Sequence, residues 1–152
     1  MSESPLEALL ERVARLEDAE LARNLLHAYA EILDDPTPEE VAALFTEDGV
    51  LSVPAGDFVG REGIIAFYRD RLGPGASEKR HFLTNVRTRP LEPGLVEVAS
   101  YFVFTAREAD ASGLGWGTYL DVIEVADGTA LFRRKTITPH VNTDLVRGWP
   151  AH

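Results

Sequence analysis

The sequence predicts an α+β fold in which N-terminal helices pack on one face of a curved, mostly antiparallel sheet. Through the first half of the chain, apolar residues recur every three or four positions, which is the spacing of an amphipathic helix. From Lys79 onward the pattern changes to long β-type runs that are separated by short turn sequences. Because the helices come first and a strand meander follows, we expect the helices to cover one face of that sheet.

Two capping boxes mark the starts of the first two helices. Residues 4–7 (Ser-Pro-Leu-Glu) combine a cap serine, a proline at the first helical position and a glutamate three residues after the cap. A helix is therefore expected from there to about Leu33. Thr37 and Glu40 form a second capping box, which predicts a short helix that ends near Phe45.

A third helix and five strands complete the expected elements. The helix is predicted over residues 60–72, before a break at Gly73-Pro74-Gly75, and residues 54–57 are predicted to form a turn. Strands are expected at residues 50–53, 80–89, 95–107, 114–125 and 130–140. The separators 92–94, 109–113 and 127–128 are typical of hairpins. A chain of 152 residues without an internal repeat or linker is expected to form one domain, residues 1–152.

Composition and charge argue against several kinds of partner. The net charge of −10 would repel a nucleic-acid backbone, and no stretch approaches the roughly 20 continuous apolar residues of a membrane span. The chain has no cysteine and its four histidines do not have ligand spacing, so we expect no metal and no cofactor. The N-terminus lacks the basic start and apolar block of a secretory signal, and we therefore expect a cytoplasmic location.

The strand around Tyr101 predicts a homodimer. Along residues 98–104 apolar side chains occupy both faces of the expected strand. Helices can cover only one of these faces, so we expect the other to pack against a second copy of the chain. The alternative is a long strand that runs through the middle of a monomeric core.

Asp34 and His81 are the candidate catalytic residues. Asp34 follows two apolar residues at the end of the first helix, and His81 opens a strand on which alternation places Leu83 and Asn85 on the same side. An acid that hydrogen-bonds one ring nitrogen would fix the histidine tautomer, so that the other nitrogen can take a substrate proton. The alternatives are a solvated Asp34 beside a turn and a buried histidine that is satisfied by one hydrogen bond.

Several aromatic residues are candidates for the walls of a substrate pocket. The expected substrate-binding residues are Tyr29, Asn85, Tyr101, Trp116 and Tyr119. Asn85, Tyr29 or Tyr101 would steady a developing oxyanion or leaving group, although aromatic residues at strand spacing are also typical of a plain core. In residues 113–117 (GLGWG) the glycines are interpreted as points where a sheet bends, because no Lys-Ser/Thr of a phosphate loop follows.

Four segments of the chain resemble the SnoaL-like families of the nuclear transport factor 2-like superfamily. They are residues 24–34 (NLLHAYAEILD), 42–50 (AALFTEDGV), 58–64 (FVGREGI) and 81–85 (HFLTN). The resemblance covers roughly residues 16–140 and implies a cone-shaped α+β barrel with a deep pocket between sheet and helices. In its dehydratase, dehydrochlorinase and polyketide cyclase members, an aspartate that ends the first helix and a histidine that opens the first long strand act as a dyad. These positions fall on Asp34 and His81.

The dyad and the resemblance together predict a cofactor-free lyase or isomerase of dehydratase or cyclase type. His81, oriented by Asp34, would abstract a proton from a small, largely apolar substrate. Residues 133–137 (RRKTI) also resemble the mainly structural small subunit of aromatic-ring hydroxylating dioxygenases, so a noncatalytic partner subunit or ligand-binding module is one alternative. An epoxide or ester hydrolase in which Asp34 activates water is another.

Overall fold

The computed structural model describes residues 4–71, 78–108 and 111–146. Within these ranges the elements follow the order α1 (Pro5–Ile32), α2 (Pro38–Ala43), β1 (Phe45–Val53), β2 (Gly56–Val59), α3 (Gly60–Arg71), β3 (Glu78–Glu92), β4 (Leu95–Arg107), β5 (Ser112–Ala126) and β6 (Thr129–Asp144). None of the helices in these ranges is both long enough and apolar enough to cross a membrane.

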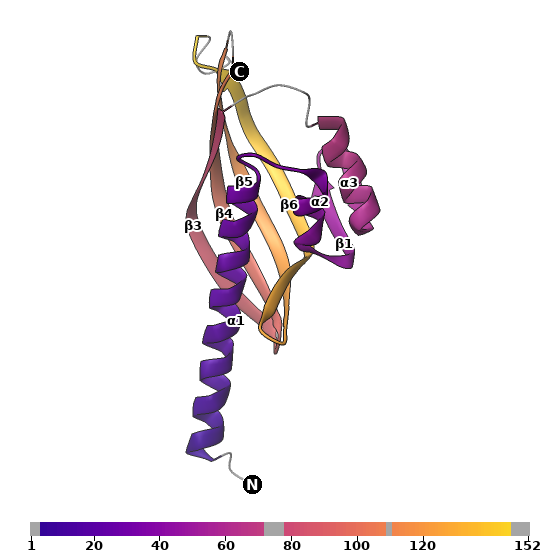
Figure 1. Ribbon diagram of the computed structural model, residues 1–152. Helices are drawn as coiled ribbons and strands as arrows, with labels where there is room; N and C mark the ends of the chain where they lie inside the picture. The colour runs from indigo at the N-terminus through magenta and orange to yellow at the C-terminus, as the bar shows by residue number, and fades with distance from the viewer. Residues whose placement is uncertain (1–3, 72–77, 109–110, 147–152) are drawn as a thin grey trace.

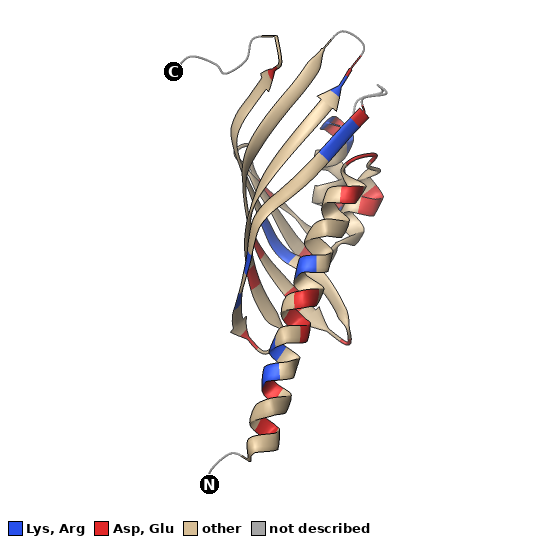
Figure 2. Ribbon diagram, turned by 90° about the vertical axis from the view of Figure 1, so that its left-hand side faces the viewer, with Lys and Arg blue, Asp and Glu red and all other residues tan. Residues whose placement is uncertain are grey.

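The six strands form one curved sheet in the order β2-β1-β6-β5-β4-β3. Neighbouring strands are antiparallel except for β1 and β6, which are parallel. The three helices lie on the same side of this sheet, and none of the described helices covers the opposite side (Figures 1 and 2). The predicted α+β architecture is therefore confirmed.

The two predicted capping boxes are present and start their helices. Ser4 Oγ accepts a hydrogen bond from Glu7 N at 3.2 Å, and the Glu7 carboxylate accepts one from Ser4 N at 2.9 Å. Thr37 and Glu40 make the same reciprocal pair at the start of α2. These bonds satisfy backbone amides that have no partner in the first turn of a helix, which explains why the starts could be predicted.

The β1–β2 hairpin differs from the prediction. Strand β1 begins at Phe45, and residues 56–57, expected in a turn, belong to β2, with Val53 paired to Gly56. Gly56 has φ of 127°, which lets the chain reverse over two residues rather than four. The predicted break at Gly73-Pro74-Gly75 and part of the separator 109–113 lie outside the described residues.

The core lies between α1 and the inner face of the sheet, which is the face that the helices cover. On β4, side chains alternate between this face and the outer face, so that Val98, Ser100 and Phe102 are buried while Tyr101 is exposed. The second half of α1 buries Ala22, Leu25, Leu26, Tyr29 and Ala30 against the inner face. This packing fixes where α1 ends relative to β3.

Candidate active site

Asp34 and His81 come together where the end of α1 meets the start of β3. Leu33 caps α1, and Asp34 follows directly, with its backbone N–H bonded to Glu31 O at 3.2 Å. His81 lies on the inner face of β3 and pairs with Phe104 of β4, whose ring centroid is 5.9 Å from that of the imidazole. The long separation in sequence is thus closed by the packing of α1 along β3.

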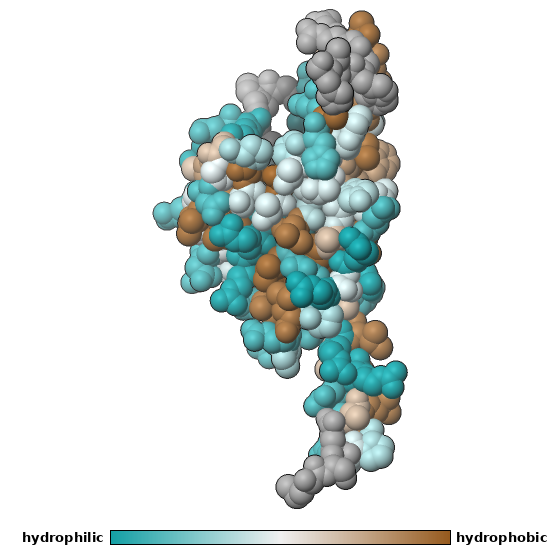
Figure 3. Space-filling view, turned by 180° about the vertical axis from the view of Figure 1, so that it is seen from behind, coloured by the Kyte–Doolittle hydropathy of each residue, from teal (hydrophilic) through white to brown (hydrophobic). Residues whose placement is uncertain are grey.

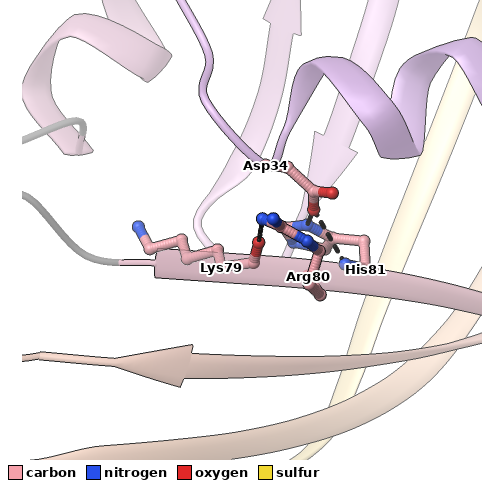
Figure 4. Close-up of polar contacts among 4 residues, drawn as sticks. All are labelled: Asp34, Lys79, Arg80 and His81. Atoms are coloured by element: carbon pink, nitrogen blue, oxygen red, sulfur yellow. Dashed lines mark hydrogen bonds and ion pairs between the residues drawn. The ribbon is translucent and has the colours of Figure 1, made fainter.

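One carboxylate oxygen holds both the backbone and the ring of His81. Asp34 Oδ1 accepts a hydrogen bond from His81 N at 2.8 Å and lies 3.0 Å from His81 Nδ1 (Figure 4). Because a carboxylate can only accept, the ring nitrogen that bonds to it carries the hydrogen. The arrangement favours the tautomer in which Nδ1 is protonated and Nε2 has a free lone pair.

The surroundings of His81 favour a neutral ring. Its side chain is 12% exposed, and burial lowers the pKa below the ordinary 6.5, against the opposing effect of the hydrogen bond and charge of Asp34. The charge of Lys79 lowers the pKa further. A neutral imidazole that is buried and oriented by a carboxylate can accept a proton through Nε2 at neutral pH.

A second polar cluster lies on the inner side of the sheet. It consists of Tyr29, Tyr68, Tyr119, Asp121 and Lys135, and we call it the floor cluster. Lys135 Nζ lies 3.0 and 3.2 Å from the two carboxylate oxygens of Asp121, and neither side chain is exposed to solvent. Burial raises the pKa of Asp121 to about 6 and lowers that of Lys135, in each case against the effect of the partner. The ammonium group also lies 3.7 to 4.7 Å from three aromatic ring centroids.

Two of the expected substrate-binding residues belong to this floor cluster. Tyr29 Oη and Tyr68 Oη are 2.6 Å apart, and the Tyr29 ring meets Tyr119 edge to face at a centroid distance of 5.9 Å. Tyr29 is 0% exposed and Tyr119 is 4% exposed. Both therefore lie on the inner side of the sheet, where they are packed as part of the core, and their role as walls of a substrate pocket stays a prediction.

Sequence reasoning missed Asp121 and Lys135, although alternation along the strand gave a signal for Asp121. The Asp127-Gly128 turn starts the β5–β6 hairpin, and a register shift between Val122 and Ile123 then pairs Asp121 with Lys135. Asp121 also alternates with Tyr119 and Ile123, both of which are buried. A charged residue at an inward position on each strand of one hairpin is the pattern of a buried ion pair.

Asn85, Tyr101 and Trp116 do not lie beside the Asp34–His81 pair, contrary to their expected place in one pocket. A bulge in β3 between Thr84 and Arg87 interrupts the alternation that was expected to place Asn85 with His81, and Asn85 is exposed with φ of 54°. Tyr101 and Trp116 alternate with inward-facing residues of β4 and β5, so both lie on the outer face.

Two of the grooves that the described residues line are on the outer face of the sheet. Asn85, Tyr101 and Thr118 contribute to one, and Tyr101, Trp116 and His140 contribute to another. The deep pocket between sheet and helices stays a prediction. In the described part of the chain, no three His, Asp or Glu side chains gather as metal ligands would.

The family follows from a match over most of the chain. The model of the SnoaL-like domain matches residues 14–136. The chain belongs to the SnoaL-like family. A comparison with curated proteins finds no significant sequence match.

Solved structures similar to this SnoaL-like protein have the same fold. A protein from Novosphingobium aromaticivorans, provisionally assigned as a scytalone dehydratase, has a TM-score of 0.78 at 24% identity over 88% of this chain and 91% of its own. The hexachlorocyclohexane dehydrochlorinase LinA-type3 of Novosphingobium barchaimii has a TM-score of 0.77 at 18% identity over 93% of this chain and 99% of its own. At these identities the likeness establishes the cone-shaped α+β fold and leaves the activity to be argued from the site.

Proposed function

We propose that this SnoaL-like protein is a cofactor-free lyase or isomerase that removes a proton from a small, largely apolar substrate. His81 Nε2 takes the proton, and Asp34 fixes the ring and stabilises the imidazolium that forms. The observation that carries the proposal is the pair of contacts from Asp34 Oδ1 to the backbone and ring nitrogens of His81, at 2.8 and 3.0 Å.

The geometry supports a proton-abstracting histidine over the hydrolase alternative. In the hydrolase alternative Asp34 would activate water itself, whereas here its Oδ1 receives two bonds from His81 and so orients the imidazole. The pKa of His81 is lowered by burial, so the ring is in its basic form at neutral pH. The imidazole Nε2, with its lone pair and its ring held by Asp34, is thus placed to act as the general base.

The similar structures support the class of reaction. A dehydratase removes water from its substrate, and a dehydrochlorinase removes hydrogen chloride; both are eliminations in which a proton leaves carbon. Double-bond migration and ring closure begin with the same proton loss. We therefore propose an elimination or a related carbon-acid reaction, with the substrate recognised by an apolar site near the Phe104 ring.

The test uses substrates that report proton abstraction directly. Scytalone, hexachlorocyclohexane and 5-nitrobenzisoxazole, which opens after one proton transfer from carbon, are offered to the full chain and product formation is followed. We expect turnover of at least one of them, and a loss of about 10²- to 10⁴-fold in kcat/KM for both His81→Ala and Asp34→Asn. Turnover of none of the three, or full activity in either variant, would contradict the proposal.

Two neighbouring substitutions serve as matched controls. Asp35→Asn makes the same charge change one residue after Asp34, at an exposed side chain. His27→Ala removes an exposed histidine of α1. Both controls are expected to retain wild-type turnover, so a loss that is confined to Asp34 and His81 reports the dyad rather than the general effect of losing a charge or a ring.

We also propose that the outer face of the sheet forms a homodimer. Three large apolar side chains of this face, Phe82, Tyr101 and Leu120, are 52%, 51% and 48% exposed. They lie on adjacent strands β3, β4 and β5, and hydrophobic surface is visible over this face among polar side chains (Figure 3). Large apolar side chains exposed on adjacent strands are typical of an interface between copies.

A further inference from the structure

The first half of α1 carries an apolar stripe that faces away from the core. Leu6, Leu9, Val13 and Leu16 are 64%, 53%, 42% and 71% exposed. At 3.6 residues per turn, this stripe lies roughly half a turn around the helix from the buried positions of the second half, Ala22, Leu26 and Tyr29. Further along α1, the side of the stripe carries the exposed polar residues Glu20, Asn24 and His27. The stripe is therefore a separate surface and does not continue the core.

This half of α1 projects beyond the sheet. Figures 1 and 2 show the helix extending past the ends of the strands towards the N-terminus. On its side next to the body, Asp18 Oδ2 accepts a hydrogen bond from Gly94 N at 3.1 Å, and Glu11, Ala14, Arg15 and Asp18 line a groove beside the β3–β4 turn. The chain thus holds the helix by polar contacts on one side and leaves the apolar side uncovered.

The spacing of the stripe is that of a coiled-coil seam. The intervals from Leu6 to Leu9, Val13 and Leu16 are three, four and three residues, which corresponds to positions a, d, a and d of a heptad. In this register Arg12 is at position g and Glu17 at the following position e. In a parallel pair of helices, position g of one chain faces that position e of the other, so Arg12 of each copy would face Glu17 of its partner.

We propose that the stripe is the contact surface for a second copy of this chain, with residues 5–17 of the two copies forming a short parallel coiled coil. Neither Arg12 nor Glu17 makes an ion pair within the described part of its own chain. They are available for the pairing that the register requires. Because β-branched Val13 at position a and leucines at position d favour two strands, the assembly is a dimer of helices.

The fold reduces the cost of this association. An isolated helix of 13 residues is marginal in water, but residues 5–17 continue without a break into a second half that is anchored on the sheet. The helix is thus formed before its partner arrives. A membrane surface is the less favourable occupant, because the polar residues of this segment include Glu7, Glu11 and Glu17 rather than an excess of basic side chains.

The absence of cysteine from the chain allows a direct test. Leu9→Cys and Ala14→Cys are each made in the full chain and oxidised mildly at micromolar concentration. A disulfide requires Cα atoms within about 7 Å of each other. A parallel in-register pair brings the two copies of position 9 together and keeps position 14 on the outside, so we expect a covalent dimer for Leu9→Cys and at least about tenfold less for Ala14→Cys.

Charge exchange identifies the partner as a second copy. In the Leu9→Cys background, Arg12→Glu and Glu17→Arg each place like charges across the seam and are expected to lower the rate of covalent dimer formation at least about twofold. The chain that carries both Arg12→Glu and Glu17→Arg has opposite charges across the seam again, and its rate of covalent dimer formation is expected to be restored. Residues 12 and 17 are five apart and do not face each other within one helix, so restoration reports contact between chains.

Three outcomes would overturn the proposal. The first is equal cross-linking at positions 9 and 14, or at neither of them. The second is a double exchange that is no better than either single change. The third is flotation of the chain with vesicles of anionic phospholipid that Leu9→Glu abolishes, in a protein that stays uncross-linked, since this would assign the stripe to a membrane surface.

Discussion

At the scale of single residues, the geometry of His81 follows from the sharing of one acceptor atom. Because Asp34 Oδ1 receives both the backbone N–H and the ring N–H of the same residue, the ring is held relative to its own strand. The carboxylate comes from the end of a helix whose second half is anchored in the core. Caps and periodicity placed Asp34 at a helix end and His81 at a strand start, and the resemblance to the SnoaL-like families implied that the two act as a dyad.

The pH dependence of kcat/KM is predicted from the pKa of His81. The ring must be neutral to take a proton, so kcat/KM is expected to rise with pH through a midpoint below 6.5 and then reach a plateau. Since burial is the main cause of the lowered pKa and Lys79 adds to it, Lys79→Met is expected to raise the midpoint and leave the plateau unchanged. Arg80→Met, which removes the neighbouring exposed cation, is the control. A midpoint well above 6.5 would count against His81 as the base.

At the scale of helices and strands, local signals were sufficient for some features and failed for others. The capping boxes of α1 and α2 act within four residues, and the sequence located both. The bulge in β3 depends on how Thr84 and Arg87 pair with β4, so alternation alone placed Asn85 on the wrong face. The partners of Asp121 and Lys135 likewise become visible only after the register of the β5–β6 hairpin is known.

The buried ion pair between β5 and β6 gives a prediction for stability. Lys135→Met leaves the Asp121 carboxylate buried without its partner and is expected to lower the free energy of unfolding by about 3–5 kcal/mol in urea titrations near pH 7. Burial raises the pKa of Asp121 in the folded protein. As the pH rises through that pKa, more of the buried carboxyl groups become charged, so the loss of stability is expected to grow.

A double variant and a neighbouring variant complete this test. Adding Asp121→Leu to Lys135→Met removes the uncompensated charge and is expected to restore most of the lost stability. Arg134→Met breaks the exposed pair with Asp57 and is expected to have a much smaller effect. If Lys135→Met proved as stable as the wild type, the ion pair would not hold the two strands.

The glycines of β5 give a second prediction at this scale. A Cβ at Gly117 would lie 2.8 Å from the Phe102 ring and would also clash with Thr138 O. Gly117→Ala is therefore expected to lower the free energy of unfolding by about 1–3 kcal/mol, measured in the same urea titrations. Gly113→Ala, whose Cβ would meet Ala106 Cβ at an ordinary 3.6 Å, is the matched control and is expected to be tolerated. Equal stability of the two variants would contradict the close packing of β5 on β4.

At the scale of the whole molecule, two apolar surfaces are not covered by any described helix or strand of the chain. One is the outer face of the sheet, which the sequence predicted from apolar residues on both faces of β4. The other is the stripe on the projecting half of α1, which the sequence showed only as part of one long apolar periodicity. The two halves of α1 can be told apart only from the structure. The packing of the second half on the sheet decides which side of the helix faces the core.

The proposed dimer through the outer face predicts a change in mass. Tyr101→Glu places a charge in the middle of this face and is expected to lower the mass seen in light scattering at micromolar concentration to that of the pair held by the α1 stripe, and to that of a monomer when Leu9→Glu is added. Glu124→Gln, at an exposed position of β5, is the control and is expected to leave the mass unchanged. Because Leu9→Glu tests the helix stripe independently, the two interfaces can be distinguished. A Tyr101→Glu chain with the wild-type mass would show that the outer face is not an interface.

The ring nitrogens of His81 provide the most direct measurement, by nitrogen-15 NMR of the full chain across a pH titration. If Asp34 orients a neutral general base, His81 will carry its hydrogen on Nδ1 and titrate below 6.5. The Asp34→Asn variant will titrate lower still, because Asp34 raises the pKa of the ring. A His81 that carries its hydrogen on Nε2, or whose titration is unchanged in Asp34→Asn, would contradict the assignment of His81 as the base.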